Sequence, residues 1–230
     1  LPMMLAWYFT RVPLPPNLRQ VALAGMITLV PVALIARQPD LGTAILVFGS
    51  GFAVLFLAGM YWRILAALTA LAAVAIPYVW THLHGYQQKR ILTLLDPTSD
   101  PLGAGYHTLQ GMIAIGSGGF FGKGWRNSSQ AHLDYLPESS TDFIFAVFAE
   151  EFGLLGILVL LGLYLFIVYR GFQIALLAQD SFTRLLSGGL TLVFFFYFFV
   201  NIGMVSGILP VVGVPLPIIS YGGTALITLM

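Results

Sequence analysis

Residues 136–156 read LPESSTDFIFAVFAEEFGLLG, and within a few positions they change from a polar loop to an apolar helix. Asp142 lies at the change, and Glu150 and Glu151 lie further along, inside the apolar part. A carboxylate within a membrane helix costs free energy, so such residues usually face a cavity or a partner and are candidates for function. The fold and the function therefore depend on what surrounds these three acids.

The composition of the whole sequence is typical of a membrane protein. Of its 230 residues, 58% are hydrophobic and only 8% are charged, and the mean hydropathy is +0.90. Soluble domains carry about 25% charged residues, so a soluble globular domain is excluded. The net charge is +1 with no strongly basic stretch, which argues against a nucleic-acid partner. The sequence has no cysteine, so disulfides and thiol chemistry are excluded.

The apolar runs predict an all-α, polytopic membrane protein with about six transmembrane helices, because about 20 apolar residues cross a bilayer core. The runs are too long for the strands of a barrel. We expect residues 1–230 to form a single membrane domain that is part of a longer protein, since the sequence starts and stops inside apolar runs. The runs cover residues 1–9, 21–36, 41–62, 64–83, 143–169, 185–209 and 211–230.

The positive residues of the loops predict the orientation. Arginines flank or occupy the first, third and fifth connections, namely Arg11, Arg19, Arg63, Arg170 and Arg184. Because positive residues mark cytoplasmic loops, the fourth connection, residues 84–141, should lie on the outer face. This large loop has helix-like apolar spacing followed by a cluster of glycines, so we expect short helices and turns packed at the membrane surface.

Some motifs in the sequence have ordinary interpretations. The stretch GSGGFFGKG, residues 116–124, fails the spacing of a nucleotide-binding P-loop and follows no predicted strand. The four histidines have no cysteine or carboxylate at ligand spacing, so no metal site is predicted. Asn201 lies in an apolar run, where hydrogen bonding between helices is its usual role.

The acids of the opening segment cannot share one helix face. Relative to Asp142, Glu150 would lie about 80° and Glu151 about 180° around a helix of 3.6 residues per turn. Asp142 fits a helix N-cap, which does not exclude catalysis, and we assign Glu150 and Glu151 to helix packing or to the floor of a cavity. Asp40, in RQPDLG, could either cap the next helix or face the same outer cavity as Asp142.

An outer site that combines acids with cations suits an anionic, lipid-linked substrate. There an acid could deprotonate a hydroxyl group while cations stabilise the charge that develops on a phosphate leaving group. The residues alone do not choose the reaction.

Four segments resemble the signatures of the RodA/FtsW family, also called SEDS proteins. They are the opening segment together with QPDLGTAI, DPLGAGYHTLQGMIAIGSGGFFGKGW and NIGMVSGILPVVGVPLPIISYGG. The resemblance runs in order over nearly the whole sequence, and it is closest to the RodA branch. It implies a family fold of ten helices, of which this chain would hold the end of the fourth through part of the tenth.

The resemblance also implies a function. It suggests a peptidoglycan glycosyltransferase of the bacterial inner membrane, with its active site facing the periplasm, that polymerises lipid II for lateral wall elongation and rod shape. Its partner would be a class B penicillin-binding protein, and a divalent cation is the only cofactor left open. Two rival functions remain, a lipid II flippase and a scaffold for the penicillin-binding protein.

The family roles can be carried over residue by residue. Asp142, in STDFIF, would be the general base that takes the proton from the C4 hydroxyl of the acceptor sugar. Many members have a histidine where this sequence has Ser140, so a role for that histidine does not carry over. The residues expected to bind substrate are Asp40, Lys89, Arg90, Gln110, Lys123, Arg126, Gln130 and Glu138.

Overall fold

The computed structural model describes residues 1–38, 40–82, 85, 88, 92–94, 96, 103–132, 136 and 140–221. The chain divides into two compact units, and each is described here by itself. The first unit combines Leu1–Leu83 with Ile167–Phe196, and the second combines His84–Phe166 with Tyr197–Met230. The long helices α8 and α9 each contribute one part to either unit.

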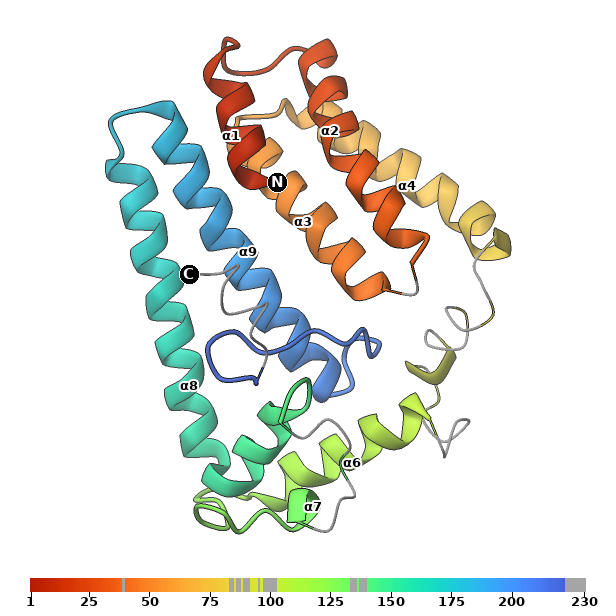
Figure 1. The fold of residues 1–230 in the computed structure, drawn as a ribbon, viewed down its shortest axis with the longest axis vertical. Helices are drawn as coiled ribbons and strands as arrows, with labels where there is room; N and C mark the ends of the chain where they lie inside the picture. The colour runs from red at the N-terminus through yellow and green to blue at the C-terminus, as the bar shows by residue number, and fades with distance from the viewer. Residues whose placement is uncertain are drawn as a thin grey trace. The chain divides into compact units, whose positions relative to one another are not determined.

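All regular elements of the described residues are helices, which confirms the all-α prediction (Figure 1). Three of the described helices, α2, α8 and α9, are long and apolar enough to cross a membrane, and shorter apolar helices lie within α3 and α4. The helices are α1 (Pro2–Thr10), α2 (Leu18–Ala36), α3 (Leu41–Leu57), α4 (Trp62–His82), α6 (Ala104–Ser117), α7 (Ser129–His132), α8 (Ile144–Leu177) and α9 (Ser181–Val205). The helices α6 and α7 confirm that the large loop contains short helices, and its packing at the membrane surface stays a prediction.

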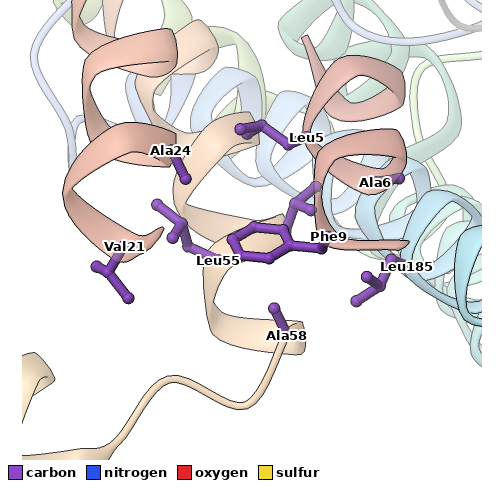
Figure 2. Packing of buried hydrophobic residues seen from close by; sticks show 9 residues of the cluster. Leu5, Ala6, Phe9, Val21, Ala24, Leu55, Ala58 and Leu185 are labelled. Atoms are coloured by element: carbon purple, nitrogen blue, oxygen red, sulfur yellow. The ribbon is translucent and has the colours of Figure 1, made fainter. Parts of the chain in front are cut away.

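The first unit has an apolar core built mainly from small and aliphatic side chains (Figure 2). Leu5 and Phe9 of α1 pack against Leu55 of α3, and Leu185 of α9 closes the cluster. Close packing is possible because small residues let membrane helices approach one another. A Cβ added at Gly51 of α3, for example, would collide with the side chain of Thr28 of α2.

Helix α8 is broken at Gly153, although the sequence predicts an uninterrupted helix there. The backbone angles of Gly153 are φ 64° and ψ −163°, a region that is essentially open to glycine alone. In Figure 1 the green part of α8 before the break turns away from the axis of the teal part after it. Residues 154–177 are helical for about 36 Å at 1.5 Å per residue, so this part alone can cross a bilayer core.

The glycine-rich stretch, residues 118–124, fills the break in α8. Lys123 N and Gly124 N donate to the carbonyls of Glu150 and Glu151, each over 3.0 Å. On the far side of the break, Leu154 N donates to the carbonyl of Gly119 over 2.9 Å. Gly153 is buried, and buried backbone groups that leave a helix need such protein partners. The close backbone contact explains why glycines occupy this stretch.

The end of the described chain differs from the sequence prediction. A helix was expected to begin at Val211, but residues 211–221, which we call the proline segment, form irregular backbone and turns. Pro215 and Pro217 have no backbone N–H and disfavour helix at the residue before them, which is why the apolar run does not continue as a helix here. Gly213 adopts φ 72°, which also suits a turn.

The break in α8 can be tested with two glycines of the same helix. Gly153→Ala should lower the free energy of unfolding in detergent by at least roughly 1–3 kcal/mol, because alanine is strained at this backbone conformation. The new Cβ would also meet the backbone of the glycine-rich stretch. A Cβ at Gly162 would meet open space, so Gly162→Ala should not lower stability. Equal stability of the two variants in thermal unfolding would contradict this account of the break.

Candidate functional site

Asp142 lies in the turn that leads into α8, two residues before the helix begins. Asp142 is partly buried, and its carboxylate lies close to the proline segment. A Cβ added at Gly213 would lie only 3.3 Å from Asp142 Oδ2. The carboxylate therefore faces a backbone that carries no side chain at this point.

The turn that carries Asp142 is held by hydrogen bonds to three consecutive carbonyls. Asn201 Nδ2 of α9 donates to the carbonyl of Asp142 over 2.8 Å. Ser220 Oγ donates to the carbonyl of Thr141 over 2.6 Å, and Tyr221 N donates to that of Ser140 over 2.9 Å. Each of the residues 140–142 thus has its carbonyl held by one hydrogen bond, so the main chain that carries the Asp142 side chain is fixed.

The proline segment is itself anchored to both long helices of the second unit. Asn201 Nδ2 donates a second bond to the carbonyl of Val214 over 2.6 Å. The buried hydroxyl of Tyr164, in α8, donates to the carbonyl of Pro217 over 2.7 Å. Within the segment, Leu216 N donates to Ser220 Oγ over 2.6 Å. These bonds satisfy backbone that lies outside any helix, and they hold the segment against the Asp142 turn.

Glu150 is the centre of a second polar cluster, which joins α8 to the large loop. Its side chain is fully buried, and its carboxylate accepts a charged hydrogen bond of 2.6 Å from Lys123 Nζ. It also accepts bonds from the hydroxyls of Ser128 and Ser129 and from the backbone N–H groups of Ser129 and Gln130. Such saturation by donors is what a buried carboxylate requires. Glu150 thus ties the large loop to α8, a structural role that the sequence analysis had placed in helix packing or at a cavity floor.

Lys123 and Gln130, two residues predicted to bind substrate, belong to this cluster. Lys123 Nζ uses two of its three N–H donors on Glu150 and Ser129, and its side chain is 34% exposed. Gln130 contributes its backbone N–H to Glu150, while its Oε1 is buried without a hydrogen-bond partner among the described residues. Their binding of substrate stays a prediction, and any anion at Lys123 would share the ammonium group with Glu150.

The other predicted residues fall in several places. Gln110 lies in α6, and Arg126 is an exposed residue of the large loop with φ 59°. Asp40 caps α3, because its carboxylate accepts bonds from the N–H and the hydroxyl of Thr43, over 3.0 and 2.6 Å. Asp40 belongs to the first unit, so the structure does not relate it to Asp142. The remaining three lie outside the described residues: Lys89, Arg90 and Glu138.

Some residues near Asp142 were missed by the sequence interpretation. Nothing in the local pattern singles out Ser220 or Gly213 as neighbours of this acid, or Tyr164 as an anchor of the proline segment. Asn201 was noted as a polar residue in an apolar run, and that signal was correct, although its partners are main-chain carbonyls. Among the described residues, no group of three or more His, Cys, Asp or Glu is arranged to hold a metal ion.

The chain has several apolar helices long enough to cross a membrane, and the irregular stretches between them are hydrogen bonded within the protein. These features define it as part of a multi-pass α-helical membrane protein. The model of the cell cycle protein family FtsW/RodA/SpoVE matches residues 1–230. The chain therefore belongs to this family.

Relatives and solved structures agree with the assignment. The chain is 56% identical over its whole length to the peptidoglycan glycosyltransferase MrdB of Escherichia coli K12, and covers 62% of that protein. It is 34% identical to the RodA of Treponema pallidum, with 98% of this chain and 69% of the relative covered. This chain thus spans about three-fifths of the E. coli relative's length.

Two solved structures are similar along nearly the entire chain. One comes from work on the structural coordination of polymerization and crosslinking by a peptidoglycan synthase complex, with a TM-score of 0.82 and 35% identity. The match covers 99% of this chain and 63% of the chain in that structure. The other is the rod shape determining protein RodA of Thermus thermophilus, with a TM-score of 0.64, 32% identity, and coverage of 99% of this chain and 58% of that one.

The Glu150 cluster predicts a stability defect. Glu150→Gln should lower the free energy of unfolding by roughly 1–3 kcal/mol, because charged hydrogen bonds to a buried group are lost. The loss should stay below that of a fully buried ion pair, since Lys123 can turn toward solvent. Thermal unfolding in detergent measures the change, and turnover per folded molecule should be little affected.

Glu151 is the matched control for this experiment. It is the next residue of α8, and the described part of the chain shows no side-chain hydrogen bond or ion pair for it. Glu151→Gln should therefore leave stability near that of the unchanged protein. Complete loss of turnover in folded Glu150→Gln protein would instead place Glu150 in the mechanism.

Proposed function

We propose that the protein containing this chain is a peptidoglycan glycosyltransferase that polymerises lipid II for cell elongation and rod shape. The observation that carries the proposal is the fixed position of Asp142, on a turn whose three carbonyls are all hydrogen bonded. The name of the E. coli relative, which is 56% identical, supports the choice of reaction. The site would face the periplasm from the bacterial inner membrane, as the loop arginines predict.

In this reaction Asp142 acts as general base. Its carboxylate takes the proton of the C4 hydroxyl of the acceptor sugar, and the oxygen attacks the anomeric carbon of the donor. The bond from that carbon to the diphosphate oxygen breaks with inversion, and undecaprenyl diphosphate leaves with the electron pair. A base of this kind works best when it is held in one orientation, which the anchored turn provides.

Cations of the large loop bind the diphosphate groups of the two lipid-linked substrates. Arg126 is exposed on the same unit as Asp142, and Lys89 and Arg90 belong to the same loop. Charged hydrogen bonds from such residues to phosphate are stronger than neutral ones. The partner is a class B penicillin-binding protein, in keeping with the solved structure that concerns a peptidoglycan synthase complex.

The contacts of two polar residues favour the transferase over a flippase. A flippase needs a polar path through the membrane, for which the sequence offered Glu150, Glu151 and Asn201. Glu150 is buried within its cluster, and Asn201 is buried with its N–H donors on two main-chain carbonyls. Both therefore serve internal contacts. Polymerisation of purified lipid II in detergent separates the transferase from the flippase and from the scaffold.

The general base gives the main prediction. In the full-length protein with its partner, Asp142→Asn should abolish polymerisation of lipid II, because the amide keeps the shape of the side chain and loses the basic oxygen. Expression and partner binding should be retained. Asp180→Asn is the control, since Asp180 lies in the α8–α9 connection, where it accepts a bond from Thr183 N that asparagine can also accept. Near-normal glycan synthesis by Asp142→Asn would overturn the assignment of the base.

The loop cations give a prediction about binding. Arg90→Ala should raise the KM for lipid II roughly tenfold to hundredfold, since a charged contact contributes about 1.5–3 kcal/mol. Arg90 is a sharper choice than Lys123, because loss of Lys123 would also disturb Glu150. Arg184→Ala, at the start of α9, should leave KM unchanged. An equal rise of KM in both variants would contradict both the topology and the site.

A further inference from the structure

We infer that Asn201 is a positioning residue for Asp142. Its side-chain amide holds in place both the turn that carries Asp142 and the proline segment that the Asp142 carboxylate faces. This inference rests on the proposed function, because it deepens the role of the same site. It concerns a residue of α9 that touches the main chain of the catalytic turn.

The hydrogen bonds of Asn201 join three separate parts of the second unit. Its side chain is fully buried near the end of α9. Nδ2 carries two N–H donors, and it makes one bond to the carbonyl of Asp142 and one to the carbonyl of Val214. One planar amide thus fixes the distance between α9, the Asp142 turn and the proline segment.

The second of these bonds controls the surroundings of the Asp142 carboxylate. Val214 directly follows Gly213, whose Cα region is the backbone that Asp142 Oδ2 approaches. Because Asn201 holds Val214, it also sets how near Gly213 comes to the carboxylate. If this bond is lost, the proline segment can shift against Asp142 and change the direction in which its oxygens point.

The amide oxygen of Asn201 shows that burying this side chain costs free energy. Asn201 Oδ1 is buried and has no hydrogen-bond partner among the residues that the structure describes. An apolar side chain of similar size, such as leucine, would avoid leaving a buried acceptor unsatisfied. The two bonds of Nδ2 are therefore what the asparagine contributes at this position, and both end on segments that surround Asp142.

Ser220 holds the same turn at the neighbouring residue, Thr141. Its hydroxyl donates to the carbonyl of Thr141 and accepts from Leu216 N, so it links the residue before Asp142 to the proline segment. Its role differs from that of Asn201 in that it lies within the segment itself. A change at Ser220 removes a single oxygen atom and is therefore a milder test of the same idea.

The experiment compares kcat and KM in the full-length protein with its partner. Asn201→Leu should lower kcat per folded molecule about a hundredfold, because a displacement of about 1 Å of a reacting group has an effect of this size. The KM for lipid II should stay near that of the unchanged protein, since Asn201 contacts no substrate in the proposed mechanism. Ser220→Ala should lower kcat in the same direction by a smaller factor, and it decides the test if Asn201→Leu does not fold.

Ser206→Ala is the matched control. Ser206 directly follows α9, and among the described residues its hydroxyl donates to carbonyls of its own helix, those of Ile202 and Gly203. Its loss should leave both kcat and KM unchanged. A residue that served stability alone would lower the folded fraction and leave kcat per folded molecule intact. That result for folded Asn201→Leu, or for Ser220→Ala where the former does not fold, would overturn the inference.

The outcome for Asp142→Asn separates this inference from the proposed function. If Asp142→Asn polymerises lipid II normally, the proposed base is wrong, and a loss of kcat in the Asn201 variant would have another origin. If Asp142→Asn is inactive while folded Asn201→Leu keeps full kcat, the base stands and the positioning role is overturned.

Discussion

A backbone N–H or carbonyl group that is buried outside a helix must find a hydrogen-bond partner within the protein. This constraint governs the second unit, where the chain leaves helical geometry at Gly153 and again along the proline segment. At Gly153 the glycine-rich stretch supplies the missing partners. Along the proline segment, Asn201, Tyr164 and Ser220 supply them. These two sets of hydrogen bonds account for the positions of Glu150 and Asn201.

The hydrogen bonds at these two irregular stretches explain why the apolar helices contain polar residues. Glu150 binds the loop that fills the break in α8, with Lys123 as its charged partner. Asn201 binds the proline segment and the turn before α8. Asp142 lies on that turn, with its carboxylate against Gly213. An acid held in this way, in a family whose relatives include named glycosyltransferases, is the natural candidate for a base.

Several features could be predicted from the sequence because they depend on local chemistry. The long apolar runs predict membrane helices whatever their neighbours are, since about 20 apolar residues suffice to cross the bilayer. The spacing of Leu109, Met112 and Ile113 predicts α6, which the structure confirms. The signature segments predict the family, and Asp142 was identified through them. The helical angle between Asp142 and Glu150 predicts that the two acids do not share one helix face.

Other features were decided only by the tertiary structure, because they depend on contacts between residues far apart in the sequence. The break at Gly153 is stable only where residues 118–124 can bond to its exposed backbone, which no local pattern in α8 reveals. The apolar run after Val211 looks like the start of a helix, yet its prolines leave backbone groups that Tyr164 and Asn201 bind from two other helices. For the same reason Asn201 could be recognised from sequence as a polar residue in an apolar run, whereas its partners could not.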